Sequence, residues 1–249
     1  MGTIYTLWIR QLKRYYRSRS RMIGTLGNPL LFLVAFSYGF GPIFQRAGEG
    51  TDYITFLAPG IIGISILMTA MASGTDIIWD RQFGFLKETF VAPVSRLQVM
   101  FGRTLGGATV AVLQGIVVLF IAMFLGFRFE TLLGFFLSLA IMLVSAIAFT
   151  AFAIAIASLI EDVQGYQFIM NFLVMPMVFL SGSVFPLNDL PKSVKIIAHF
   201  DPLSYSVDGL RSSLAGIAYF DTTLNLIVLG LLTVVFLIFG SWAFSRIRL

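Results

Sequence analysis

The amino-acid sequence predicts an all-α, polytopic membrane protein. Three observations support this fold class: a hydrophobic composition, six long apolar stretches, and basic residues gathered on one side of them. Of the 249 residues, 58% are hydrophobic and 12% are charged, whereas soluble domains carry roughly 25% charged residues. The mean hydropathy is +0.91. A transmembrane helix needs about 20 apolar residues, and six stretches come close to that length: 22–40, 54–78, 104–127, 131–159, 167–185 and 223–244. The strands of a β-barrel would instead alternate over about 10 residues.

The segment before the first span separates apolar from basic residues. Ile4, Trp8, Leu12 and Tyr15 recur at helical spacing. The opposite face of the predicted helix carries basic residues, namely Arg10, Lys13, Arg14, Arg17 and Arg21. A helix of this kind lies in the membrane interface with its cations near anionic lipid. We expect an amphipathic connecting helix over 1–21 that either only anchors the chain in lipid or also connects the bundle to a cytoplasmic partner.

The distribution of charge orients the predicted bundle, because basic residues that flank transmembrane helices stay on the cytoplasmic side. With the N-terminus inside, the cytoplasmic segments hold twelve of the seventeen basic residues and five acidic residues. The external segments hold five basic and seven acidic residues. Both termini are therefore predicted to be cytoplasmic. This topology explains the net charge of +5, and no nucleic acid is expected as a partner because the sequence has no soluble basic module.

The sequence offers few groups for catalysis or ion coupling. It has no cysteine, which excludes disulfides and thiolate metal sites. None of its lysines completes a phosphate-binding loop, and almost no charge lies deep in the predicted spans, where charge would mark ion coupling. We expect no catalytic residue, cofactor site or metal site in this chain, so an energy source must come from another subunit. A secondary transporter or channel is the alternative of another class.

The stretch "WDRQFGFLKETFVAPVSR", residues 79–96, interrupts the apolar sequence with charge. On a helical projection one stripe carries Phe83, Leu86 and Phe90. The opposite face carries Asp80, Arg81, Gly84, Lys87 and Glu88, and Phe85 lies beside Arg81. Asp80 is predicted to cap a short amphipathic helix, which ends before Pro93. The helix either rests in lipid headgroups or docks onto a partner. In the docking interpretation an exposed Phe85 enters a pocket of the partner, with Arg81 and Glu88 setting the orientation.

The segment between the last two spans, 186–222, is too interrupted by proline to cross the membrane and too apolar for a solvated loop. We expect two short helices, about 190–200 and 203–215, that dip into the outer leaflet and pack against the bundle. Asp208 and Arg211 are predicted to form an ion pair. The segment would close the external mouth of a pathway, and its candidate gate residues are Phe185, Pro186, Asp201, Pro202, Tyr205, Asp208 and Arg211.

Two stretches carry a resemblance to a known family. Residues 52–108, "DYITFLAPGIIGISILMTAMASGTDIIWDRQFGFLKETFVAPVSRLQVMFGRTLGGA", resemble the signature region of type-2 ABC exporter permeases. Residues 185–211, "FPLNDLPKSVKIIAHFDPLSYSVDGLR", are similar to the second landmark of that family, with Asp201 where many members have asparagine. The order of landmarks covers the chain as one transmembrane domain: 1–21 connecting helix, 22–185 spans one to five, 186–222 external segment, 223–249 span six and tail. "WDRQFGFLKE" looks more like the drug and lipophile (daunorubicin-type) branch than the polysaccharide branch.

The resemblance implies a permease subunit in a prokaryotic plasma membrane that moves a drug-like or lipid-like amphiphile out of the cytoplasm. A polysaccharide or lipid-linked glycan is the alternative cargo. The implied assembly has two permeases, as a homodimer or alternatively a heterodimer, and two cytoplasmic ATPases that bind ATP and Mg. Residues from Asp80 to Phe90 would form the coupling helix. The first, second and fifth spans would line the path, with candidates Phe32, Phe36, Tyr38, Thr69, Ser73, Phe168, Asn171 and Phe172.

Overall fold

The computed structural model describes residues 2–46, 52–91, 94–187 and 191–247, and no strand occurs in these ranges. The chain forms the helices α1 (Gly2–Arg17), α2 (Arg19–Arg46), α3 (Tyr53–Gln82), α4 (Phe85–Val91), α5 (Arg96–Phe124), α6 (Leu132–Leu159), α7 (Val163–Leu180), α8 (Lys192–Ala198), α9 (Pro202–Ala215) and α10 (Thr222–Ser245). The predicted all-α class is confirmed.

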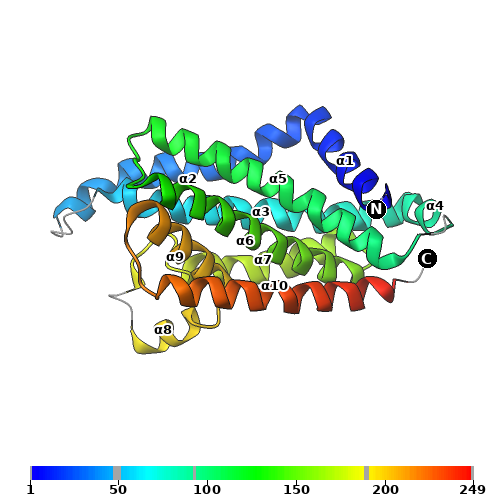
Figure 1. The fold of residues 1–249 in the computed structure, drawn as a ribbon. Coiled ribbons are helices and arrows are strands. Elements are labelled where there is room, and N and C mark those ends of the chain that lie inside the picture. The colour runs from blue at the N-terminus through cyan, green and yellow to red at the C-terminus, as the bar shows by residue number, and fades with distance from the viewer. Residues whose placement is uncertain (1, 47–51, 92–93, 188–190, 248–249) are drawn as a thin grey trace.

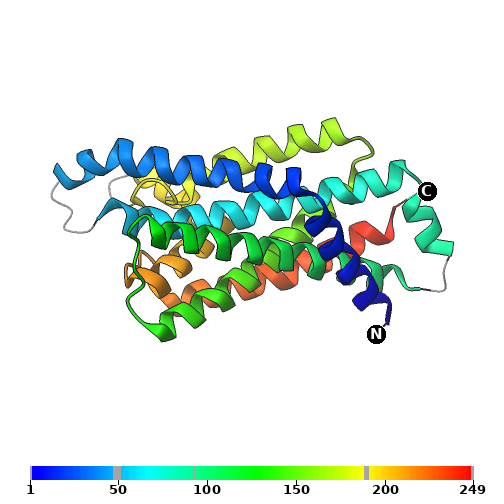
Figure 2. The ribbon, with the colours of Figure 1, turned by 90° about the horizontal axis from the view of Figure 1, so that it is seen from above.

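Six of these helices, α2, α3, α5, α6, α7 and α10, are long and apolar enough to cross a bilayer, as predicted. They run side by side along one axis (Figure 1). Both described chain ends and α4 lie at the same end of the bundle, here called the terminal end. At this end α1 turns sharply away from α2 (Figure 2). The break falls at Ser18, so the amphipathic connecting helix is shorter than predicted.

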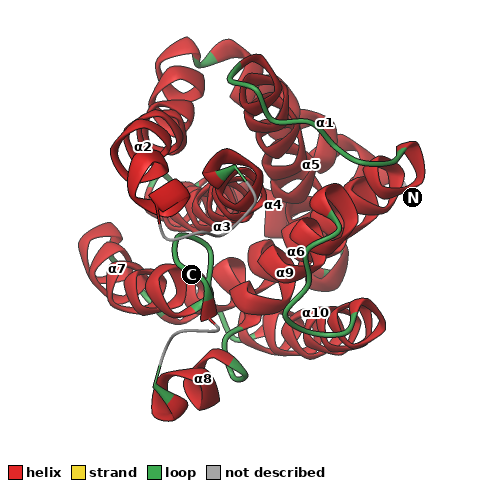
Figure 3. Cartoon of the chain, turned by 90° about the vertical axis from the view of Figure 1, so that its left-hand side faces the viewer, coloured by secondary structure: helices red, strands yellow, loops and turns green. Residues whose placement is uncertain are grey.

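The centre of the bundle is formed by α3 and α6. α3 packs against α2, α5, α6 and α9. In its most apolar 18-residue stretch, 83% of the residues are buried. α2 and α7 lie at the margin on either side of α3 (Figure 3). In the most apolar 18-residue stretch of each of these helices, only 11% of the residues are buried. These two helices therefore leave most of their apolar surface uncovered by this chain.

Close packing at the end opposite the termini depends on a glycine. Gly60 of α3 lies against the backbone of Ser183, and a Cβ at Gly60 would collide with the carbonyl oxygen of Ser183. Small residues let backbones approach closely inside a membrane bundle. This contact brings the turn after α7 against the central helix.

The two short helices expected between the last spans are confirmed as α8 and α9. Asp201 caps α9 by accepting a hydrogen bond from the Leu203 amide at 2.9 Å, and Pro202 takes the first helical position. Gly216 ends the helix in a left-handed conformation with φ +65°. α9 is buried against α3, α6 and α10.

The charged stretch 79–96 folds differently from the prediction. α3 continues through Asp80 and Arg81 to Gln82, and Gly84, with φ +76°, makes the turn into α4. Asp80 therefore lies in the last helical turns of α3, and its predicted role as the cap of the amphipathic helix is wrong. Within α3 the Asp80 carboxylate forms ion pairs with arginines of other helices. α4 ends at Val91, and Pro93 lies outside the described residues.

Candidate functional site

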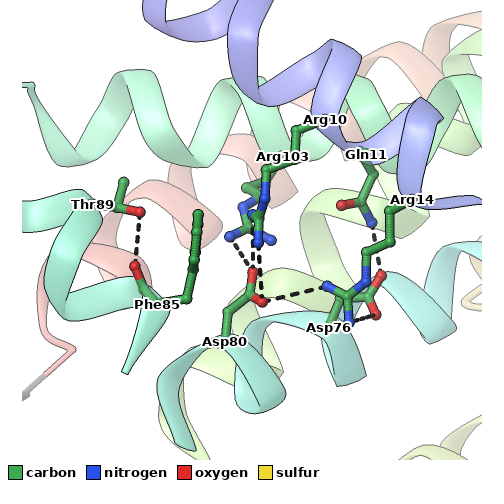
Figure 4. A network of polar contacts seen from close by, with 8 residues as sticks. All are labelled: Arg10, Gln11, Arg14, Asp76, Asp80, Phe85, Thr89 and Arg103. Carbon is green, nitrogen blue, oxygen red and sulfur yellow. Dashed lines mark hydrogen bonds and ion pairs between the residues drawn. The ribbon is translucent and has the colours of Figure 1, made fainter. Parts of the chain in front are cut away.

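Four helices, α1, α3, α4 and α5, meet at the terminal end around two carboxylates (Figure 4). Asp76 and Asp80 are one helical turn apart on α3 and both are buried. Arg10 and Arg14 are likewise one turn apart on α1, so the spacing of the two arginines equals that of the two carboxylates where α1 crosses α3.

Asp80 lies among three guanidinium groups. Nη1 of Arg10 is 3.2 Å from Oδ2 of Asp80, and Nη1 of Arg14 is 3.4 Å from Oδ1. Nη2 of Arg103, on α5, contacts the same Oδ2 atom. Asp80 thus joins α1, α3 and α5 through a single carboxylate.

Asp76 adds a second connection between α1 and α3. Gln11 donates from Nε2 to Oδ2 of Asp76 at 2.7 Å, and Nη2 of Arg14 lies 3.2 Å from Oδ1. Arg14 therefore bridges both carboxylates of α3.

Arg103 is the most deeply buried cation of the cluster, with 2% of its surface exposed. Its Nε and Nη1 atoms have no hydrogen-bond partner among the described residues. A buried charge that loses its partner is strongly destabilising. Arg103 thus depends on Asp80 for compensation, which fixes α5 against α3.

Arg10 also connects this cluster to α4, because its guanidinium carbon lies 3.6 Å from the centre of the Phe85 ring. Phe85 is half-buried by this contact, so the prediction that it is a freely exposed anchor is wrong. Phe83 is more exposed, with 78% of its surface accessible, and its ring stacks on Trp79 with centroids 5.3 Å apart. Phe83 was predicted on the apolar stripe with Leu86, but only Leu86 is buried.

The other charged residues of the stretch differ in their surroundings. Lys87 and Glu88 are exposed on α4. Arg81 forms an ion pair with Glu161, with Nη2 and Oε1 3.1 Å apart, and so connects the end of α3 to the turn after α6. The side chain of Phe90 lies outside the described residues. Outward-facing groups available to a partner are therefore Phe83, Lys87 and Glu88.

The basic face predicted for the connecting helix is present on α1. Lys13 and Arg17 are exposed, and they line a cavity of about 730 Å³ with Arg10 and Arg14. The opposite face packs on α5, where Nε1 of Trp8 donates to Oγ1 of Thr109 at 3.0 Å. α1 therefore lies on the bundle as an amphipathic helix.

Two predicted path residues, Thr69 and Ser73, are buried rather than open to a path. Oγ1 of Thr69 donates to Oε1 of Gln114 at 2.8 Å, and Nε2 of Gln114 donates to the Tyr15 hydroxyl at 2.7 Å. Polar groups in a low-dielectric interior pair with one another, and here they join α1, α3 and α5. That Thr69 and Ser73 line a path stays a prediction.

The remaining path candidates lie on the margin helices α2 and α7. Most of them are exposed: Phe32, Tyr38, Phe168, Asn171 and Phe172. Phe36 is half-buried and stacks on Phe32 with ring centroids 5.7 Å apart. Both helices thus present aromatic surface that this chain does not cover.

The predicted ion pair between Asp208 and Arg211 does not form in the described residues. Arg211 donates from Nη2 to the carbonyl oxygen of Gly182 at 2.8 Å and from Nε to that of Phe56 at 3.2 Å. Asp208 accepts from the amides of Tyr219 at 2.7 Å and Phe220 at 3.0 Å. Irregular backbone at membrane depth needs such partners, so each side chain binds a turn instead of its neighbour.

The other gate candidates lie around these turns. Phe185 is partly exposed, and its ring meets Phe40 edge-on with centroids 5.9 Å apart. The hydroxyl of Tyr205 donates to the carbonyl oxygen of His199 at 2.7 Å. Asp201 and Pro202 begin α9, and Pro186 is half-buried.

Sequence reasoning missed Arg103, Asp76 and Gln114 as joining residues. The sequence does carry a signal for the contact between α1 and α3, because the spacing of Arg10 and Arg14 equals that of Asp76 and Asp80. Nothing comparable marks Arg103, which is a single cation at the start of an apolar stretch.

Comparisons with known proteins agree with this architecture. A family model described as ABC-2 type transporter matches residues 3–215. The chain is 28% identical over 252 residues to nodulation protein J of Rhizobium leguminosarum bv. viciae, covering 97% of this chain and 95% of that protein. It is 29% identical over 210 residues to the putative transport permease ycf38 of Cyanophora paradoxa, covering 81% of this chain and 69% of that protein. It is also 27% identical over 235 residues to nodulation protein J of Neorhizobium galegae, covering 92% and 86%.

Proposed function

The chain belongs to the ABC-2 type transporter family, and from that membership we propose that it is the permease of an exporter driven by a separate ATPase. It is a multi-pass membrane protein and the permease subunit of an ABC transporter. Membership in the family implies an ABC ATPase subunit as partner, so the chemistry of ATP and Mg belongs to that partner.

The contact between Arg10 and Phe85 carries the coupling proposal. α4 protrudes from the terminal end (Figure 1). Lys87 and Glu88 on α4, and Phe83 in the turn before it, are exposed. Pressure from the ATPase on α4 would pass through Phe85 to Arg10 and from there to Asp80 on α3. Because Asp80 also binds Arg14 and Arg103, α1, α3 and α5 would move together as a rigid unit.

The working assembly in this proposal contains two permease chains and two ATPases. The uncovered surfaces of α2 and α7 support a second permease, since this chain buries only 11% of the residues in the apolar stretch of each helix. A homodimer is the simpler arrangement. The terminal end would face the cytoplasm of a prokaryotic cell, across the plasma membrane, in agreement with the basic residues of α1.

The proposed cargo is an amphiphile that is drug-like or lipid-like. The aromatic side chains on α2 and α7, among them Phe32, Phe168 and Phe172, support this cargo because they offer large apolar contact areas. The same rings could stack on sugars, which keeps a glycan as the second candidate.

Reconstitution tests the proposal directly. The chain and its ATPase, placed in vesicles, should move a fluorescent amphiphile when ATP is supplied, and a non-hydrolysable ATP analogue should abolish the movement. A fluorescent oligosaccharide is the competing cargo, and its selective movement would favour the glycan. Transport by the chain alone, without any ATPase, would instead establish a secondary transporter or channel.

A further inference from the structure

The side chain of Gln114, on α5, connects the two helices that meet at the N-terminal break of the chain. It is buried, and its Nε2 atom donates to the hydroxyl of Tyr15 on α1 at 2.7 Å and to that of Thr25 on α2 at 2.6 Å. Tyr15 comes before the break at Ser18 and Thr25 comes after it. One amide group therefore holds both sides of the break at which α1 turns away from α2 (Figure 2).

The hydrogen bonds fix the orientation of this amide. The hydroxyl of Thr69 on α3 donates to Oε1 of Gln114 at 2.8 Å. The hydroxyl of Thr25 donates to the carbonyl oxygen of Met22 at 3.3 Å, so its oxygen accepts from Nε2. Both hydrogens of the Gln114 amide and its oxygen are thus in use. Because the amide lies inside a membrane-spanning helix, the low dielectric strengthens these bonds.

The three partners of Gln114 are closely packed around it. Tyr15, Thr25 and Thr69 line a cavity of about 10 Å³ between α1, α2, α3 and α5. A space of this size holds one water molecule at most. The hydroxyl groups therefore have little room to separate while the amide keeps its bonds.

The backbone at the break is where the angle between α1 and α2 is set. Ser18 belongs to neither helix: its amide donates to the carbonyl oxygen of Tyr15 at 3.1 Å, and its carbonyl oxygen accepts from the Met22 amide at 3.1 Å. Residues at the ends of helices are the usual positions at which a domain movement changes the backbone torsion angles. A side-chain connection across such a residue resists this change.

The two helices on either side of the break have different neighbours. α1 contacts α4 through Arg10 and Phe85, and it packs along α5. α2 lies at the margin and carries the exposed aromatic residues Phe32 and Tyr38. A fixed angle at Ser18 would therefore connect the helix next to α4 with a helix that this chain leaves uncovered.

We propose that Gln114 is a positioning residue that fixes the angle between α1 and α2, so that a displacement of α4 by the ATPase also moves α2. The inference rests on the proposed function, in which α4 receives the movement of the ATPase and α2 faces the cargo. It extends the unit formed by α1, α3 and α5 to a fourth helix.

An isosteric substitution tests the connection in the reconstituted transporter. Thr25→Val keeps the shape of the side chain but removes the acceptor on α2, and Thr25→Ser retains the hydroxyl. Thr104→Val is the matched control, because Thr104 is also buried and its hydroxyl donates to Sδ of Met100 within α5 at 3.7 Å. ATPase binding and the amount of cargo moved per ATP hydrolysed are measured for each variant.

We expect Thr25→Val to bind the ATPase as the wild type does and to move several-fold less cargo per ATP. Thr25→Ser should restore the wild-type ratio, and Thr104→Val should retain it. A wild-type ratio in Thr25→Val, or equal losses in Thr25→Val and Thr104→Val, would overturn the inference.

A distance measurement tests the angle without any transport. Spin labels are attached to cysteines that replace Lys13 on α1 and Leu31 on α2, both of which are exposed. Labelled chain is diluted with unlabelled chain so that distances within one chain dominate. The distribution should be narrow in the otherwise wild-type chain and in Thr104→Val, and broad in Thr25→Val. An equally narrow distribution in Thr25→Val would refute the role of Gln114, whereas absence of ATP-driven transport by the wild type would refute the proposed function instead.

Discussion

The guanidinium carbon of Arg10 lies 3.6 Å from the centre of the Phe85 ring, and the same guanidinium donates to both carboxylate oxygens of Asp80. One side chain of α1 thereby touches α3 and α4 together. The amphipathic helix at the N-terminus and the short helix after α3 are mechanically connected, although they are far apart in sequence.

Phe85→Ala should reduce ATP-driven transport while the ATPase still binds, because the ring mediates contact within the chain. A cation–π contact of this kind contributes about 0.5–2 kcal/mol. Phe83→Ala should instead weaken ATPase binding in a pull-down assay, since Phe83 is 78% exposed. Phe85→Tyr, which keeps an aromatic ring, and Lys13→Ala, on the exposed side of α1, serve as controls. Loss of ATPase binding in Phe85→Ala with normal binding in Phe83→Ala would reverse these assignments.

Asp80→Asn should destabilise the chain by about 3–5 kcal/mol, as expected when one member of a buried ion pair is removed. The reason is that Arg103 would remain buried next to an uncharged amide. Glu161→Gln breaks the ion pair with Arg81 at a position where Glu161 is exposed, and should change stability by about 0–1 kcal/mol. Thermal unfolding in detergent measures both, and equal effects would argue against a structural role for the Asp80 cluster.

Gly60→Ala should destabilise the bundle by about 1–3 kcal/mol, the usual effect of overpacking. The added methyl group would collide with the backbone of Ser183. Gly230→Ala on α10 is the matched control, because a Cβ at that position meets nothing within 4 Å. The yield of folded protein and its unfolding temperature give the comparison. An unfolding temperature for Gly60→Ala equal to that of Gly230→Ala would show that the turn after α7 moves freely.

Stability should fall as the pH rises from about 4 to about 7, because of Asp201. Burial raises the pKa of this carboxyl from its usual value of 3.8 to about 7, so the folded state binds more protons than the unfolded state across that window. Asp201→Asn should remove this part of the pH dependence. Asp221 has the opposite sign, because a hydrogen bond from the Thr223 amide lowers its pKa and its stabilisation is lost at acidic pH. A pH profile of unfolding that is unchanged in Asp201→Asn would refute the assignment.

Single cysteines at Lys87 and Lys192 should react with a membrane-impermeant thiol reagent from opposite sides of the membrane. The chain has no native cysteine, so each label reports one position. We expect labelling at position 192 in intact cells and labelling at position 87 only after the membrane is opened. Labelling of both positions in intact cells would overturn the orientation with cytoplasmic termini.

The number of spans and the two amphipathic segments could be predicted from sequence, because hydrophobicity and periodicity are properties of neighbouring residues. The predicted spans correspond to α2, α3, α5, α6, α7 and α10, although α5 begins at Arg96 and not at 104. The boundary after the second span was missed, since Asp80 and Arg81 look like the start of a surface helix when their partners are unknown.

Partner choice was decided only by the tertiary structure. Asp208 and Arg211 are three residues apart and carry opposite charges, yet each binds the backbone of a different turn. Local spacing suggests an ion pair, but unsatisfied backbone groups at membrane depth are more costly than an unformed ion pair.

The sequence by itself determined that this chain is a bundle of six apolar helices with a basic amphipathic helix at one end, because these features follow from composition and from the 3.6-residue period. Only the tertiary structure decided that Arg10 meets Phe85, that Arg103 depends on Asp80, and that Thr69 and Ser73 are buried. The two side-chain contacts join residues that are 75 and 23 positions apart, and their formation depends on how the helices pack, which no local pattern encodes.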